Sequence, residues 1–352
     1  MRTHLIAFMV AAALTAGAWA ATEDKPHVVI LATGGTIAGS AESQTQAGYT
    51  SGQVGVEVLI NAVPQLAQLA EVTGEQIANV GSQDMSDAIW LELARRVHEI
   101  AAQPDVDGIV ITHGTDTIEE TGYFLNLVSR TDKPVVMTAA MRPSTALSAD
   151  GPLNIYNAVA VAADPGARER GVLIVVNDDI HGARAITKSS TTDVHTFTSP
   201  ERGLIGVSLY GINQFFRTPY RLHGAQSEFS VAGVESLPRV DVVYVTAGVS
   251  PDIIDAAVEN GAKGLVTAGV GNGNMTAEAL EAVERAIAAG VVVVRASRVS
   301  YGSVGRNVEV DDDAVGTVAA GDLNPAKARI LLKLALLKTT DPAKIQDYFD
   351  RY

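Results

Sequence analysis

Two short segments of this sequence place hydroxyl groups beside glycines, directly after runs of apolar residues. Residues 33–36 read Thr-Gly-Gly-Thr, and residues 113–117 read His-Gly-Thr-Asp-Thr. Paired glycines allow a sharp turn that brings backbone amides close to a ligand. The second segment adds a carboxylate, Asp116, between two threonines. Because the sequence has no cysteine, any chemistry at these segments uses oxygen and nitrogen side chains.

Each segment also has an explanation that involves no catalysis. A glycine-rich turn such as residues 33–36 can bind phosphate or simply pack closely. Neither this turn nor residues 269–274 matches the dinucleotide fingerprint, and no Walker lysine follows either, so nucleotide binding is disfavoured. In the second segment, Asp116 or Thr117 could cap a helix that has acidic residues in its first turn. The residues alone leave these alternatives open.

Composition and spacing exclude several classes of protein. The formal charge of −14 argues against nucleic acid or an anionic membrane surface as a partner, since both attract positive charge. The lack of cysteine excludes thiolate zinc sites, iron–sulfur clusters and disulfides. The seven histidines form no ligand-spaced cluster, and His98-Glu99 lacks the second histidine of a zinc-binding helix. We therefore expect no metal and no cofactor. The absence of a G-x-S-x-G turn also leaves an α/β-hydrolase without support.

Alternating strands and helices should position the two segments. Nearly all-apolar runs are typical of strands buried on both faces of a parallel sheet, and amphipathic helical patterns such as 89–102 and 275–289 lie between them. The runs cover residues 28–33, 108–112, 134–139, 172–177, 240–246, 264–268 and 291–296. We predict an α/β fold with a mostly parallel, doubly wound sheet in a large N-terminal domain and a smaller α/β C-terminal domain. Ligands of such sheets bind beyond the carboxyl ends of the strands, where both segments lie.

The pattern divides the chain into four regions. Residues 1–20 combine a charged start, a short apolar run and an Ala-Trp-Ala cleavage site, which is typical of a secretory signal peptide. We expect residues 21–216 to form the N-terminal domain with the main catalytic residues, and residues 240–352 to form the C-terminal domain. Between them, residues 217–239 are irregular and read as a linker. An exported protein without cysteine suggests a bacterial periplasm, with no membrane attachment after cleavage.

Longer motifs around these segments resemble the signature segments of bacterial type II L-asparaginases. The two long matches are ILATGGTIAG at 30–39 and VITHGTDT at 110–117. Shorter matches are GSQD at 81–84, AMRPS at 140–144, SADG at 148–151 and GVGNGN at 269–274. The resemblance runs in order from about Val28 to the last residue. It implies hydrolysis of the side-chain amide of free L-asparagine to L-aspartate and ammonia.

The resemblance implies a catalytic set of oxygen and nitrogen groups. Thr36 is the implied nucleophile with Tyr49 beside it, while Thr115, Lys188 and Asp116 form a second constellation. Lys188 can act as a base toward a hydroxyl only in its neutral form. Without the resemblance, Lys188 would be interpreted as a solvated surface lysine. The sequence does not decide which threonine forms the covalent intermediate, and we favour Thr36.

The resemblance also implies how the amino-acid end of the substrate is held. The implied binding residues are Ser82, Gln83, Asp116, Ala140, Asn274 and Glu309. Ser82 and nearby backbone amides would hold the α-carboxylate, and Asp116, Gln83 and Glu309 the α-ammonium. The backbone of Ala140 would contact the departing amide nitrogen. Asn274 and Glu309 would come from a neighbouring subunit, so the implied assembly is a homotetramer with shared active sites.

The sequence departs from the family pattern at two places. Some members carry a disulfide in the N-terminal domain, and segment 98–107 lacks its cysteines here. Gln83 stands where members with stronger glutaminase activity tend to have Glu, so we expect asparagine preference with minor glutaminase activity.

A periplasmic amino-acid-binding protein would also explain export, acidity and two α/β domains, but not threonines and a lysine at strand ends. An inactive homologue and the family's cytosolic branch are weaker alternatives, the latter because the signal peptide opposes it.

Overall fold

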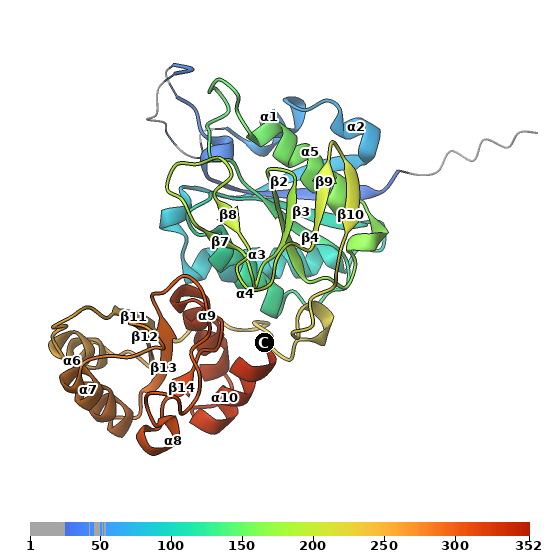
Figure 1. Cartoon of the computed structure of the whole chain (residues 1–352). Helices are drawn as coiled ribbons and strands as arrows, with labels where there is room; N and C mark the ends of the chain where they lie inside the picture. Colours follow the sequence, from blue (N-terminus) through green and yellow to red (C-terminus); the bar gives the residue numbers. More distant parts are fainter. Residues whose placement is uncertain (1–24, 42, 46–49, 51, 53) are drawn as a thin grey trace, which may run out of the picture.

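Two separate sheets organise the chain, one in each domain (Figure 1). The structure is a computed structural model that describes residues 25–41, 43–45, 50, 52 and 54–352. An eight-stranded sheet forms the centre of the N-terminal domain, and a four-stranded sheet forms the centre of the C-terminal domain. The predicted α/β class is confirmed, including the mostly parallel large sheet and the smaller second domain.

The large sheet has the strand order β10-β9-β6-β5-β4-β3-β1-β2. Its strands are β1 His27–Gly34, β2 Glu71–Val80, β3 Gly108–Thr112, β4 Val135–Thr138, β5 Val172–Val176, β6 Asp179–Gly182, β9 Gly206–Leu209 and β10 Ile212–Phe215. The pairings among β1 to β5 are parallel, and those that add β6, β9 and β10 are antiparallel. The order 2-1-3-4-5 places the topological switch point between β1 and β3, where ligands of such sheets bind.

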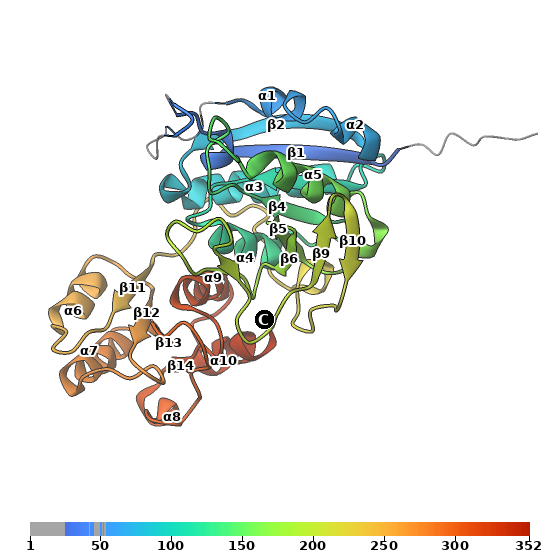
Figure 2. The same cartoon turned by 45° about the horizontal axis from the view of Figure 1, so that its top comes forward.

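Helices cover both faces of this sheet, which explains the all-apolar strands (Figure 2). Ile109 and Ile111 of β3 face the layer of α3 (Asp87–Ala101) and α4 (Ile118–Val128). Val110 faces the opposite layer. That layer contains α1 Val56–Asn61, α2 Leu66–Leu69 and α5 Gly151–Ala162. Burial on both faces leaves only strand ends open for chemistry.

The C-terminal sheet is entirely parallel and is also covered on both faces. Its strands, in spatial order, are β11 Val240–Tyr244, β12 Gly264–Gly269, β13 Val292–Ser297 and β14 Val318–Ala319. Its helices are α6 Asp252–Glu259, α7 Ala277–Ala288, α8 Asp312–Val315, α9 Pro325–Leu336 and α10 Pro342–Arg351. The Thr276 side chain caps α7 by accepting from the Ala279 amide. Helix α9 packs against α4, so the two domains share one apolar core.

Short elements fill the connections between the main ones. A two-stranded ribbon pairs β7 (Thr187–Lys188) with β8 (Phe197–Thr198). Single 3₁₀ turns occur at Thr36–Ala38, Ser82–Asp84, Pro165–Ala167 and Gly224–Gln226. In segment 217–239, the Phe229 ring packs against Tyr348 and Tyr352 of the chain's end. No helix in the described part of the chain is long and apolar enough to cross a bilayer.

Candidate active site

The loops that follow β1 and β3 touch each other at a pair of glycines. Gly35 adopts a φ of 82°, which favours glycine, and a Cβ added to it would lie 2.4 Å from the Gly114 Cα atom. Gly34 has a φ of 108° and is equally tight against the Val80 backbone. Thr36 therefore begins its 3₁₀ turn beside the segment that carries Thr115. Both threonines are buried.

Lys188 joins the second threonine segment from the β7–β8 ribbon. Its Nζ atom donates to the Thr115 Oγ1 atom at 3.0 Å and to the Asp116 Oδ1 atom at 2.6 Å. Lys188 pairs with Phe197 across the ribbon, which fixes the backbone from which its side chain extends. Its side chain is only 18% exposed, so it is not the solvated lysine that the sequence alone would suggest. The structure brings Thr115, Asp116 and Lys188 together.

Ser82 connects the end of β2 to the same segment. Its Oγ atom accepts a hydrogen bond from the Asp116 amide at 3.1 Å, and its carbonyl accepts from the Thr117 Oγ1 atom at 2.7 Å. Thr117 occupies the N-cap position of α4 without making a side-chain cap, and Asp116 contacts Lys188. Helix capping therefore does not explain these two side chains. The exposed Gln83 follows Ser82 in the chain and folds back over Gly81.

The segment after β4 closes another side of this region. Asp150 accepts hydrogen bonds from the Met141 and Arg142 amides, both at 2.9 Å, and so fixes the chain just after Ala140. Helix α5 begins at Gly151, where an added Cβ would lie 3.2 Å from Ile37 and 3.5 Å from the Ala140 Cβ. Ala140 is therefore close to the 3₁₀ turn that contains Thr36. Tyr49 lies outside the described residues.

Asn274 and Glu309 lie together on the C-terminal domain, apart from the other predicted residues. The Asn274 side-chain amide donates to the Glu309 carboxylate. Within the described residues, no hydrogen bond or ion pair joins either of them to Thr115, Asp116 or Lys188. One chain therefore contains two separate groups of the predicted site residues.

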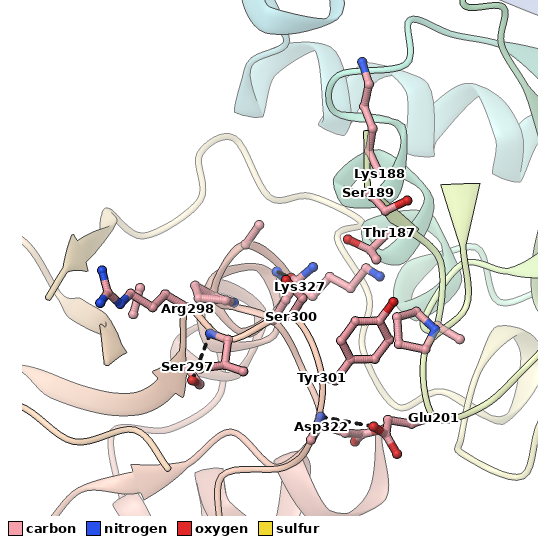
Figure 3. Close-up of a pocket in the computed structure, with 18 of the residues that line it drawn as sticks. Thr187, Lys188, Ser189, Glu201, Ser297, Arg298, Ser300, Tyr301, Asp322 and Lys327 are labelled. Carbon is pink, nitrogen blue, oxygen red and sulfur yellow. Dashed lines mark hydrogen bonds between the residues drawn. The ribbon is translucent and has the colours of Figure 1, made fainter. Parts of the chain in front are cut away.

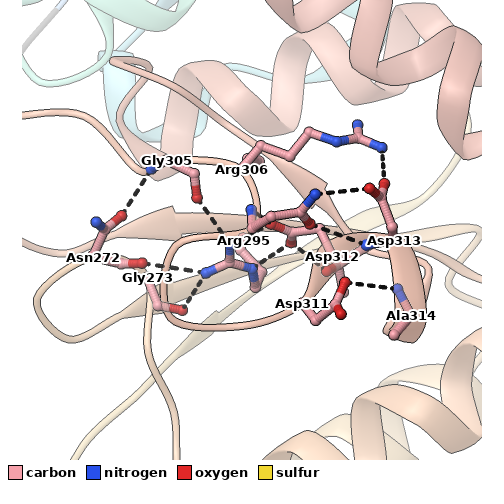
Figure 4. A network of polar contacts seen from close by, with 12 residues as sticks. Asn272, Gly273, Arg295, Gly305, Arg306, Asp311, Asp312, Asp313 and Ala314 are labelled. Carbon is pink, nitrogen blue, oxygen red and sulfur yellow. Dashed lines mark hydrogen bonds and ion pairs between the residues drawn. The ribbon is translucent and has the colours of Figure 1, made fainter.

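A buried arginine organises the loops that carry Asn274 and Glu309 (Figure 4). Arg295 is fully buried on β13, and its guanidinium donates to the carbonyls of Asn272, Gly273 and Gly305 and to both oxygens of Asp312. Burial alone would raise the pKa of Asp312, but hydrogen bonds from Arg295, from the Thr317 hydroxyl and from the backbone outweigh it and hold the pKa below its usual range. The sequence contains a signal for this pair, because Arg295 is the one charged residue in the apolar run at 291–296.

A second network that the sequence did not reveal orients the Thr115 segment. The His113 Nδ1–H group donates to the Gly114 carbonyl at 2.8 Å, because a carbonyl can only accept. The Nε2 atom then accepts from the Thr121 hydroxyl at 2.9 Å, and Thr121 accepts from the Trp90 indole at 2.9 Å. Complete burial lowers the pKa of His113 to about 4, so the imidazole is neutral near pH 7. The network fixes the carbonyl that immediately precedes Thr115.

Comparison with known proteins gives the family. Residues 27–220 match the family model described as asparaginase, N-terminal, and residues 239–349 match the glutaminase/asparaginase C-terminal domain. A relative named L-asparaginase 2 from Escherichia coli strain K12 is 50% identical, over 97% of this chain and 97% of its own. A glutaminase-asparaginase from Pseudomonas fluorescens biotype A is 46% identical, over 93% of this chain and 90% of its own. The chain belongs to the asparaginase family.

The predicted periplasmic location is contradicted by a solved structure to which the chain is similar. A solved structure from Campylobacter jejuni, described as "Probable Cytoplasmic L-asparaginase", matches with a TM-score of 0.91 and 45% identity, over 93% of this chain and 100% of its own. A Haemophilus influenzae relative, 49% identical over 94% of each chain, is named as periplasmic. The same fold thus occurs under both descriptions and does not specify a compartment. The signal-peptide pattern at 1–20 lies outside the described residues.

Removing the buried arginine should destabilise the C-terminal domain strongly. Arg295→Met leaves the Asp312 carboxylate without its main partner, and breaking such a pair costs about 3–5 kcal/mol of unfolding free energy. The matched control is Arg306→Met in the same network, because Arg306 pairs with Asp313 at the surface and should contribute about 0–1 kcal/mol. Denaturant unfolding of both variants measures the difference. Equal losses would contradict the role of burial.

The neutral His113 should make stability depend on pH in the acid range. Its pKa is about 4 in the folded chain and about 6.5 when unfolded, so the unfolded chain binds more protons between these values. Unfolding free energy should therefore fall as pH decreases from about 6.5 to 4, by about 3 kcal/mol from this residue. The variant His113→Asn should show a flatter dependence over that window. Parallel pH curves for the two proteins would contradict this assignment.

Proposed function

We propose that this chain hydrolyses the side-chain amide of free L-asparagine to L-aspartate and ammonia through a threonine nucleophile. Family membership supports this activity, and relatives of the chain are named L-asparaginases and glutaminase-asparaginases. The observation that carries the proposal is the contact of Lys188 with the Thr115 hydroxyl and the Asp116 carboxylate. This group lies beside Thr36 at the switch point between β1 and β3.

The proposed reaction has two halves. The Thr36 hydroxyl oxygen attacks the amide carbon and gives up its proton, the carbon–nitrogen bond breaks, and the nitrogen takes up that proton and leaves as ammonia. Water then attacks the resulting ester, releasing aspartate and restoring the Thr36 hydroxyl. Lys188 would act as the base toward the Thr115 hydroxyl, whose Oγ1 atom lies within hydrogen-bond reach of the Lys188 Nζ atom at 3.0 Å. Thr115 would then act as the proton carrier toward the reacting centre, and Tyr49 would complete the nucleophile's surroundings.

Charge and exposure support the proposed binding of the amino-acid end. The Asp116 side chain is 59% exposed, so its carboxylate can reach a substrate ammonium while contacting Lys188. Gln83 would assist at the ammonium, and Ser82 with nearby amides would hold the α-carboxylate. The backbone of Ala140 would contact the leaving nitrogen. We keep asparagine preference with minor glutaminase activity as part of the proposal, because Gln83 offers no second carboxylate at that position.

The separation of the two residue groups supports a shared active site. Asn274 and Glu309 bind each other on the C-terminal domain, and we propose that they complete the site of a neighbouring subunit in a homotetramer. Large apolar side chains are exposed on this domain, including Tyr244, Tyr301 and Val308, each at least 60% exposed, as expected for a surface that a partner covers. We propose that residues 21–216 form the N-terminal domain, residues 217–239 the linker and residues 240–352 the C-terminal domain.

Ammonia release from asparagine tests the activity directly. Thr36→Ala and Lys188→Met should each lower kcat by orders of magnitude while the oligomer persists, because each removes a reacting group. An amino-acid-binding protein would instead retain asparagine unchanged. Wild-type turnover in either variant would refute the assigned role of that residue. Comparable kcat/KM values for asparagine and glutamine in the wild type would refute the substrate preference.

Glu309→Ala tests the shared site separately from the chemistry. Because Glu309 is proposed to hold the substrate ammonium, its loss should raise KM by about tenfold or more and leave the oligomer intact. Glu284→Ala is a suitable control, since it removes a carboxylate from the same domain without touching the proposed site. Steady-state kinetics and light scattering measure both effects. An unchanged KM for Glu309→Ala would remove this residue from the site.

A further inference from the structure

A buried lysine of the C-terminal domain reaches the catalytic segments of its own chain. Lys327 lies in the first turn of α9 and is 2% exposed. It borders a cavity of about 700 Å³ between the two domains, and Lys188 lies on the wall of the same cavity. Figure 3 shows the Lys327 side chain extending toward the segment that carries Thr187 and Lys188. The mechanism proposed above does not use this ammonium.

The ammonium of Lys327 contacts two carbonyls of one segment. Its Nζ atom donates to the Arg184 carbonyl at 3.1 Å and to the Ile186 carbonyl. Ile186 is two residues before Lys188, and the intervening Thr187 belongs to the short strand β7. Two hydrogen bonds from one fixed donor define both the position and the direction of the chain at this point. These hydrogen bonds therefore fix the position of the backbone that leads into Lys188.

The same ammonium faces the beginning of α4. The Glu119 Oε2 atom lies 3.9 Å from the Lys327 Nζ atom and has no hydrogen-bond partner among the described residues. Glu119 follows Asp116 by three positions, at the start of the helix that the Thr115 segment opens. The Asn324 side-chain amide, also from the C-terminal domain, lies 3.4 Å from the other Glu119 oxygen. Lys327 thus lies between the segment that carries Lys188 and the segment that carries Thr115.

Burial makes these contacts difficult to replace. Lys327 has almost no access to water, and burial lowers its pKa to about 8 despite the nearby Glu119 carboxylate. A buried ammonium without acceptors is strongly unfavourable, so the carbonyls and Glu119 must keep their places around it. A neighbouring ion-pair cluster, in which Arg184 and Arg202 bind Asp322, also joins the domains and shares Arg184 with the Lys327 contacts. Arg202 provides the comparison, because its side chain pairs with Asp322 and, among the described residues, forms no hydrogen bond with the segments that carry Thr115 and Lys188.

We propose that Lys327 is a positioning residue that sets the distance between the Lys188 amine and the Thr115 hydroxyl. The C-terminal domain would then serve the chemistry of its own chain, in addition to the residues it offers to a neighbour. This inference rests on the proposed function, since it assigns Lys327 a role only if Lys188 and Thr115 act in the reaction. Lys327 forms no hydrogen bond or ion pair with Ser82, Gln83 or Asp116, the proposed binding residues of this chain, so its effect falls on turnover more than on substrate binding.

The test compares Lys327→Met with Arg202→Gln in the full-length protein. Lys327→Met should lower kcat for asparagine by about 10- to 100-fold with KM changed less than threefold, because small displacements of reacting groups have effects of that size. Arg202→Gln removes one interdomain ion pair and should lower the melting temperature while kcat stays within twofold of wild type. Lys327→Arg, which keeps a cation with several donors, should recover most of the lost kcat.

The outcomes separate the two proposals. No ammonia release by the wild-type protein would refute the proposed function itself. An active wild type, an inactive Lys188→Met and an unchanged kcat in a folded Lys327→Met would refute only the positioning role. Equal losses of kcat in Lys327→Met and Arg202→Gln would also refute the positioning role, because both losses would then reflect weaker contact between the two domains. If Lys327→Met does not fold, the kcat of Lys327→Gln tests the same proposal, since its shorter amide cannot reach the carbonyls of both Arg184 and Ile186.

Discussion

The site depends on one close approach of two backbone segments, at Gly35 and Gly114. No side chain larger than hydrogen fits between the loops after β1 and β3. Since β1 and β3 are neighbours on either side of the switch point, their carboxyl ends are already adjacent, and the glycine contact brings their loops together. Thr36 and Thr115, which are 79 positions apart in the sequence, thereby become parts of one region. The remaining contacts, from Ser82, Ala140 and Lys188, add to a framework that this approach creates.

Much of this framework could be predicted from the sequence, for identifiable reasons. All seven apolar runs became strands, because burial on both faces leaves a clear pattern, and the helices at 89–102 and 275–289 differ from α3 and α7 by two residues or fewer at each end. The pattern missed β2, whose residues are largely polar and whose position is the sheet edge. It also missed the short antiparallel strands β6, β9 and β10. Strands of four residues at the other edge carry too little periodicity to be recognised.

The polar interior shows where sequence patterns give less information. The motifs predicted the groups that we propose to react, but they did not predict the groups that hold them. His113 lies within the motif at 110–117, and its role depends on Thr121 and Trp90, which come close to it only in the folded chain. Arg295 and Lys327 are charged residues among apolar neighbours, and each is explained by partners that are distant in the sequence. A charged residue in a buried stretch indicates that a partner exists, whereas only the tertiary structure shows which one.

The C-terminal domain has two groups of polar contacts to which we assign roles, one within its own chain and one at a neighbouring subunit. Lys327 reaches the segments of its own chain that carry Thr115 and Lys188, whereas Asn274 donates to Glu309 and, among the described residues, neither forms a hydrogen bond with another predicted site residue. In the proposed assembly, defects would therefore fall into two genetic classes. A chain altered at Thr36 or Lys327 damages its own site, and a chain altered at Glu309 damages its neighbour's. Co-expressed chains from different classes would restore some intact sites by intragenic complementation, and chains from the same class would not.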